Sequence, residues 1–101
     1  MTLDIRGITI DLSAAVRAHI ERRLRFALGR FSGRIGRVVV RIADENGPRG
    51  GRDKRCRIAA RLGRRGTVLV EERGEDLQAM IDVAAERMGR VVARSLQRAV
   101  A

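Results

Sequence analysis

The sequence predicts an α+β fold, a two-layer α/β sandwich in which a four-stranded mixed sheet carries both helices on one face. Segments with alternating hydropathy, which is typical of strands, and segments with a helical period follow one another in the order β-α-β-β-β-α. The first strand–helix–strand unit implies a parallel pair with a right-handed crossover, and the later strands imply an antiparallel meander. Two amphipathic helices can then cover the same sheet face. With 101 residues, the chain is expected to form a single domain over residues 1–101.

The first half of the chain should form a strand and then a helix. The strand lies within residues 2–10, where apolar and polar residues alternate up to a break at Gly7. Ser13 is a suitable N-cap for the helix, because its hydroxyl can accept a free backbone N–H. We place the end of the helix near residues 29–33, which contain two glycines. The apolar positions of this helix are Val16, Ile20, Leu24, Ala27, Leu28 and Phe31.

The middle of the chain predicts three strands. Residues 36–42 are rich in β-branched side chains and alternate, which favours a strand. Residues 44–53 hold the only proline and three glycines, which indicates a loop. A strand over 55–62, a hairpin turn over 63–66 and a strand over 67–72 follow. The apolar face of the 55–62 strand consists of Cys56, Ile58, Ala60 and Leu62.

The last predicted element is a helix that begins after Gly74. We expect Glu75 and Asp76 in its first turn, where the helix dipole favours acidic groups. Its apolar stripe consists of Leu77, Ile81, Ala84, Met88 and Val92.

The charge and composition narrow the functional classes. Basic residues exceed acidic residues by ten, and Lys54 is the only lysine. Such an excess is typical of proteins that bind RNA, DNA or an anionic membrane. No apolar run approaches the roughly 20 residues of a membrane span, so no membrane is expected. The lone cysteine fits a reducing compartment, here the cytoplasm. The chain has no Trp or Tyr, and Phe26 and Phe31 are its only aromatic residues, so an RNA reader that stacks bases on aromatic platforms is not expected.

No residue pattern is typical of an enzyme. His19 has no Asp, Ser or Cys partner nearby in the sequence, and a half-buried structural role fits it better than catalysis. Cys56 alternates with apolar residues, which favours a buried position. Residues 44–47 lack the spacing of a calcium loop, and residues 50–52 lack the lysine and hydroxyl of a phosphate-binding loop. We therefore expect no enzymatic activity, cofactor, metal site or small-molecule substrate.

Arginines on the two helices are the candidate RNA-binding residues. The last helix carries four arginines three and four residues apart, which places them on one face, with no acid after Glu86 to pair with them. The first helix and its exit carry six arginines against the single acid Glu21. Guanidinium groups suit phosphate oxygens. The open sheet face, with Arg55, Arg57 and Arg61, is a second basic surface. The predicted RNA-binding residues are Arg22, Arg23, Arg25, Arg30, Arg87, Arg90, Arg94 and Arg98.

Several short runs, in the same order, resemble the ribosome hibernation promoting factor family, also described as ribosome-associated inhibitors or sigma-factor modulation proteins. In this family, basic residues stand where this chain has Arg87, Arg90 and Arg94, whereas Gln78 stands where an aromatic residue is common. The runs are Leu3-Asp4-Ile5, Leu12-Ser13-Ala14-Ala15-Val16-Arg17, Arg23-Leu24, Val38-Val39-Val40 and Glu75-Asp76-Leu77-Gln78-Ala79-Met80-Ile81-Asp82.

The resemblance implies a translation inhibitor that binds the small ribosomal subunit between head and body. There it would contact rRNA phosphates and overlap the mRNA and tRNA positions. We expect the short form of the family, without the C-terminal domain that pairs ribosomes, as a monomer or weak homodimer. Two alternatives stay open: a module that binds an acidic protein partner, and a general double-stranded RNA or DNA binder.

Overall fold

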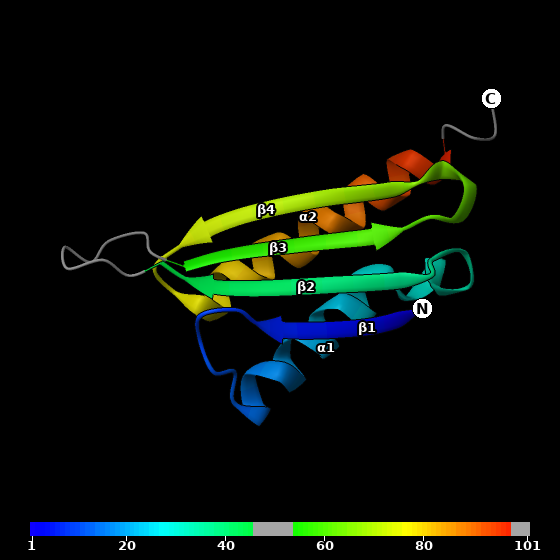
Figure 1. Ribbon diagram of the computed structural model, residues 1–101. Helices are drawn as coiled ribbons and strands as arrows, with labels where there is room; N and C mark the ends of the chain where they lie inside the picture. Colours follow the sequence, from blue (N-terminus) through cyan, green and yellow to red (C-terminus); the bar gives the residue numbers. More distant parts are fainter. Residues whose placement is uncertain (46–53, 98–101) are drawn as a thin grey trace.

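The computed structural model describes residues 1–45 and 54–97 and confirms the predicted fold class. One sheet has the strand order β1-β2-β3-β4, with β1 parallel to β2 and the other neighbouring pairs antiparallel. Both helices lie on the same face of this sheet (Figure 1). The elements are β1 (Thr2–Gly7), α1 (Ala14–Leu28), the 3₁₀ helix η1 (Gly29–Arg34), β2 (Arg37–Asp44), β3 (Lys54–Arg61), the 3₁₀ turn η2 (Gly63–Arg65), β4 (Thr67–Gly74) and α2 (Leu77–Gln97).

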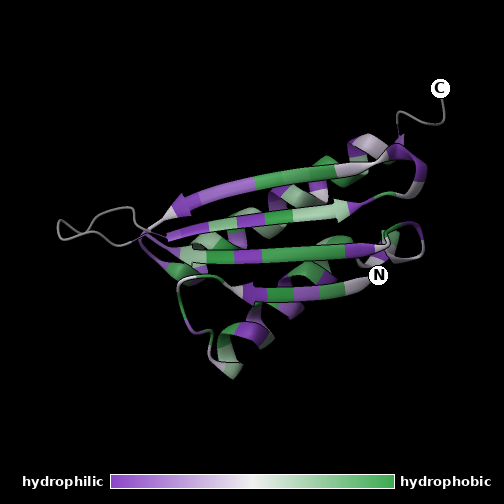
Figure 2. Cartoon of the chain, in the orientation of Figure 1, coloured by the Kyte–Doolittle hydropathy of each residue, from purple (hydrophilic) through white to green (hydrophobic). Residues whose placement is uncertain are grey.

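The space between sheet and helices is filled by apolar side chains. Figure 2 shows hydrophobic runs in the middle of β2 and β4, whereas burial alternates along β2 and β3. Each of these two strands therefore has one face toward the helices. Cys56 is fully buried in this core, as its alternation with apolar residues predicted. Among the described residues, no polar or charged residue is buried. The largest fully buried side chains are Ile20, Leu24, Leu28, Val38, Val40, Ile42, Cys56, Ile58, Val70, Ile81, Met88 and Val92.

The ends of α1 follow the sequence signals. The Ser13 hydroxyl accepts a 3.1 Å hydrogen bond from the Val16 N–H, which confirms the predicted N-cap. The helix ends at Leu28, but Gly29 keeps a right-handed conformation with a φ of −55°. The chain therefore tightens into η1 instead of leaving the helix through a left-handed glycine.

The predicted start of α2 was wrong by two residues. Glu75 and Asp76 precede the helix, and its first turn contains no acid. Asp76 flanks the first turn: its carbonyl accepts the Met80 N–H at 3.0 Å, and its Oδ1 accepts the Ala79 N–H at 3.1 Å. A short carboxylate that satisfies a free N–H is a cap, which periodicity alone does not distinguish from a first-turn position.

The turn between β3 and β4 confirms the predicted hairpin. Gly63 and Gly66 have φ values of 60° and 81°, a region that side chains with a Cβ adopt at a cost. The loop predicted over 44–53 is tested only at its start. Asp44 ends β2, Glu45 follows it, and residues 46–53 lie outside the described part of the chain.

An ion cluster on the open sheet face connects the first two strands. The Asp4 carboxylate on β1 accepts hydrogen bonds from Arg6 Nη2 at 2.6 Å and from Arg37 on β2. These two guanidinium groups lower the pKa of Asp4 from 3.8 to about 2. The carboxylate is therefore ionised in the folded chain down to a lower pH than in the unfolded chain.

We predict that Asp4→Asn destabilises the fold only where this carboxylate is ionised. Because the folded-state pKa is the lower one, the stabilisation is present above about pH 4 and is lost as the pH falls toward 2. Thermal melting of the parent and the variant across this range measures the difference. The gap between their Tm values should be widest near neutral pH and should close toward pH 2. A difference in Tm that does not depend on pH would contradict the assignment of this stabilisation to the ionised Asp4 carboxylate.

Candidate nucleic-acid interface

A groove runs between α1 and α2, and we call it the helix groove. The two helices approach closely here, because a Cβ atom on Gly89 would lie only 3.1 Å from the Ala27 carbonyl oxygen. The wall on each side carries arginine, and small residues occupy the positions between. The groove is lined by Arg23, Phe26, Ala27, Arg30, Glu86, Gly89, Arg90 and Ala93.

Several of the predicted RNA-binding arginines are paired with acids. The Arg90 Nη1 lies 2.7 Å from Glu86 Oε1, one turn away on α2. Arg87 Nη1 contacts the Glu72 carboxylate on β4 and donates a 2.9 Å hydrogen bond to the Glu71 carbonyl. The prediction of helix arginines without acidic partners was therefore wrong for these two. On α1, Arg25 Nε lies 3.1 Å from Glu21 Oε1.

Three of the predicted arginines keep their charge uncompensated. Arg22, Arg30 and Arg94 are exposed, and no acid among the described residues pairs with them. The Arg30 guanidinium lies over the Phe31 ring, 4.6 Å from its centroid, which orients it without neutralising it. Arg98 lies outside the described residues. Among the predicted RNA-binding arginines that the structure describes, these three are the ones whose charge no acid compensates.

His19 and Asp82 connect the two helices. His19 Nε2 and Asp82 Oδ1 are 2.7 Å apart, so His19 has an acidic partner that lies 63 residues away in the sequence. Arg23 Nε lies 3.2 Å from the same oxygen without hydrogen-bond geometry, so this contact is ionic. The His19 side chain is only 18% exposed. This cluster holds α1 against α2, and the structural interpretation of His19 fits it.

The open sheet face carries a second basic row. In the strand register, Arg6, Arg41 and Arg57 are neighbours across β1, β2 and β3. Arg6 is held by Asp4, whereas Arg41 and Arg57 have no acidic partner among the described residues. Like charges on neighbouring strands repel one another, and here Asp4 offsets Arg6 while Glu71 is the neighbour of Arg57 on β4. Arg55, predicted here, is paired with Glu45 at 2.9 Å.

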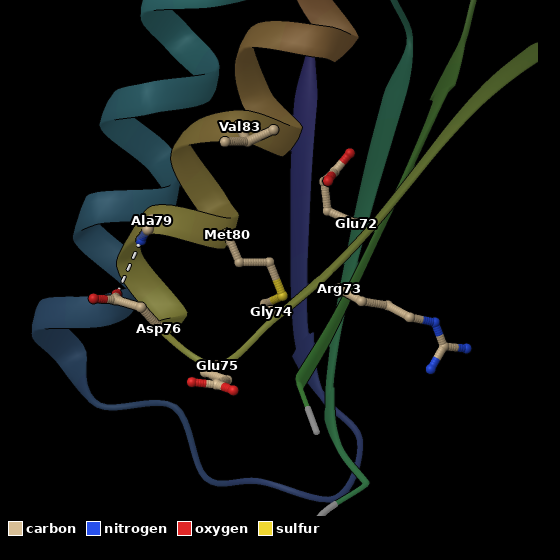
Figure 3. Close-up of a pocket in the computed structure, with 8 residues that line it drawn as sticks. All are labelled: Glu72, Arg73, Gly74, Glu75, Asp76, Ala79, Met80 and Val83. Atoms are coloured by element: carbon tan, nitrogen blue, oxygen red, sulfur yellow. Dashed lines mark hydrogen bonds between the residues drawn. The ribbon is translucent and has the colours of Figure 1, made fainter. Parts of the chain in front are cut away.

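Acidic residues gather at the start of α2. A shallow hollow at the β4–α2 connection is lined by Glu72, Glu75 and Asp76, while Arg73 points away from it (Figure 3). The acids of α2 therefore come before its arginines, as the order along the sequence indicates.

Phe26 is the groove residue to which sequence reasoning assigned no role. It is 85% exposed, more than any other large apolar side chain of the described residues. Its exposure could have been predicted from the sequence. Ile20, Leu24 and Leu28 form the apolar stripe that helical periodicity turns toward the core, and Phe26 is not part of that stripe.

We also searched residues 1–45 and 54–97 for metal sites, membrane-spanning helices and a reactive thiol. No group of three or more metal-ligating side chains occurs there, and neither helix is long and apolar enough to cross a bilayer. Burial raises the pKa of the Cys56 thiol to about 12, so it is not a reactive nucleophile at neutral pH.

We predict that Arg87→Gln lowers stability, whereas Arg94→Gln does not. The first change removes an ion pair and a hydrogen bond to β4, worth roughly 0.5–1.5 kcal/mol for a half-exposed group. The second removes an exposed charge with no partner among the described residues, which is worth little. Urea unfolding of both variants checks this. Equal unfolding midpoints for the two variants would show that the contact to β4 contributes nothing.

Comparison with known proteins places this architecture in a family. Residues 3–99 match the family described as sigma 54 modulation protein / S30EA ribosomal protein. A ribosomal subunit interface protein from Coxiella burnetii shares the fold, with a TM-score of 0.76, 93% of this chain and 96% of that chain covered, and 15% identity. The Protein Y N-terminal domain from Thermus thermophilus is 27% identical, with a TM-score of 0.74 and coverage of 93% and 98%.

No curated protein sequence matches the chain. The family match nevertheless spans almost its full length, and the fold agrees with that of the solved structures. It confirms the resemblance expected from the residue runs at the start of each helix. The chain belongs to the sigma 54 modulation protein / S30EA ribosomal protein family.

Proposed function

We propose that the chain is a non-enzymatic hibernation factor that binds the small ribosomal subunit through arginine contacts to rRNA phosphates. Bound there, it inhibits translation by occupying the channel through which mRNA and tRNA pass. Family membership supports the ribosome as the partner, and with it a cytoplasmic site of action. One structural neighbour is itself named a ribosomal subunit interface protein.

The observation that carries this proposal is the uncompensated charge on the helix layer. Arg22, Arg30 and Arg94 are exposed without acidic partners among the described residues, whereas Glu21 and Glu86 are already engaged by other arginines. An unpaired guanidinium can bind a phosphate without first losing a carboxylate. Arg25 and Arg90 are already paired, so each can bind a phosphate only after it releases its carboxylate. We therefore assign these two residues a smaller share of the affinity.

Binding of this kind needs no catalytic group. Charge positions the chain on the rRNA backbone, and the volume of the folded domain excludes other ligands from the same space. Sequence-specific reading of bases is unnecessary, because the shape of the rRNA and the spacing of its phosphates select the site. The affinity is therefore electrostatic and should respond strongly to salt.

We predict that changing Arg22, Arg30 and Arg94 together to Gln weakens binding to purified small subunits and leaves folding intact. The three side chains contact no acid among the described residues, so thermal stability should change little. The log–log dependence of affinity on salt should become shallower by about two to three units, because up to three phosphate contacts are lost. Co-sedimentation across a salt series measures both quantities.

The matched control changes three uncompensated arginines of the open sheet face, Arg41, Arg57 and Arg61, to Gln. It removes the same charge and should leave most of the affinity. A larger loss from this sheet variant would move the interface to the sheet. Displacement of the parent chain from subunits by an equal concentration of free duplex RNA would instead indicate a general duplex binder.

A further inference from the structure

Phe26 exposes an aromatic ring inside a basic groove. The ring is 85% exposed, while the core positions of α1 are taken by other residues on the opposite face. Leaving so large an apolar surface in water forgoes the stabilisation that burial would give. The charged groove residues around it are Arg23, Arg30 and Arg90 with the single acid Glu86. An exposed ring in a groove where basic residues outnumber acidic ones is suited to a flat, anionic partner.

We propose that the Phe26 ring stacks on an unpaired RNA base, while Arg30 and Arg90 bind the phosphates on either side of it. This inference rests on the proposed function for its RNA partner, and it adds which kind of nucleotide the helix groove takes. Base stacking on one exposed ring is tolerant of sequence, because every base has an aromatic face.

The placement of the arginines fits this assignment. Arg30 lies in η1, four residues after Phe26, and both side chains line the helix groove. Its guanidinium is held over the Phe31 ring, which limits its freedom and lowers the entropy lost on binding. Arg90 stands across the groove on α2, where it is paired with Glu86 at 2.7 Å and would have to exchange that carboxylate for a phosphate. An unpaired cation therefore lies on one side of the ring and a paired one on the other.

The groove also has room for a base. Between the two arginines lie Ala27, Gly89 and Ala93, none of which has a side chain longer than a methyl group. The close contact of Gly89 with Ala27 brings the two helices together and keeps this strip shallow. A planar ring can approach Phe26 here without displacing a large side chain.

An unpaired nucleotide fits better than a duplex or an acidic protein segment. In duplex RNA both faces of every internal base are already stacked, so Phe26 would find only phosphates and sugars. An acidic peptide would use the arginines but would gain little from a flat exposed ring. A lone ring is too few for a multi-base platform, but it is sufficient for one base.

The chain contains no Trp or Tyr, which provides a direct test. Phe26→Trp places the only indole in the groove, where stacking on a base quenches its fluorescence. Titration with a short single-stranded RNA of mixed, non-self-complementary sequence should give saturable quenching, and a blunt duplex of equal charge should give much less. The control is Val83→Trp, an exposed site beside the acidic hollow, where neither RNA should quench.

Affinity gives the second readout. Phe26→Ala should weaken binding of the single-stranded RNA by roughly tenfold, and Phe26→Leu should lose about as much although it keeps the apolar volume. Both changes are at an exposed position, so thermal melts should match the parent. Parent-like affinity of Phe26→Leu, an unquenched indole, or equal quenching by duplex RNA would overturn the stacking assignment.

Small ribosomal subunits separate this inference from the proposed function. If the parent chain binds them and Phe26→Leu binds equally well, the stacking inference fails while the proposed function stands. If the parent chain does not bind subunits but single-stranded RNA still quenches the indole of Phe26→Trp, the proposed function fails and the nucleotide site stands. Quenching of the same indole by subunits, with weaker binding of Phe26→Leu, supports both.

Discussion

The packing of two helices side by side on one face of the sheet is the constraint on which the other features depend. Burial of the α1 and α2 stripes fixes the rotation of each helix, so every residue off the stripe is turned outward. Gly89 allows the helices to approach to backbone contact at Ala27, and Asp82 ties them together through His19 and Arg23. The helix groove and its arginines follow from this geometry.

Several acidic residues form ion pairs between neighbouring elements, and these pairs determine which arginines keep an uncompensated positive charge. Asp4 joins β1 to β2, Glu72 joins β4 to α2, and Asp82 joins the helices. Each of these ion pairs neutralises an arginine that lies where two elements meet. The arginines left over, such as Arg22 and Arg94, lie on outer surfaces where no element packs. In the proposed function, binding uses arginines other than those that stabilise the fold, so the two properties can be varied separately.

Much of the fold was predictable because local patterns and tertiary burial agree. Strand alternation at Cys56, Ile58 and Ala60 and the cap at Ser13 need only neighbouring residues, and all are confirmed. The ion pairs were not predictable. Glu72 and Arg87 are 15 residues apart, and His19 and Asp82 are 63 apart, so only the packed helices bring them together. For the same reason sequence spacing could place the helix arginines on one face, but it could not separate paired from unpaired ones.

The central claim is that the helix layer with its groove, and not the open sheet face, lies against the small ribosomal subunit. Cys56 is buried, so one added cysteine gives a single accessible thiol. Ala93→Cys marks the groove, and Ala59→Cys, equally half-buried, marks the open sheet. The account predicts that saturating small subunits slow alkylation of the thiol at position 93 and leave the rate at position 59 nearly unchanged. Protection at position 59 with free reaction at position 93 would contradict it.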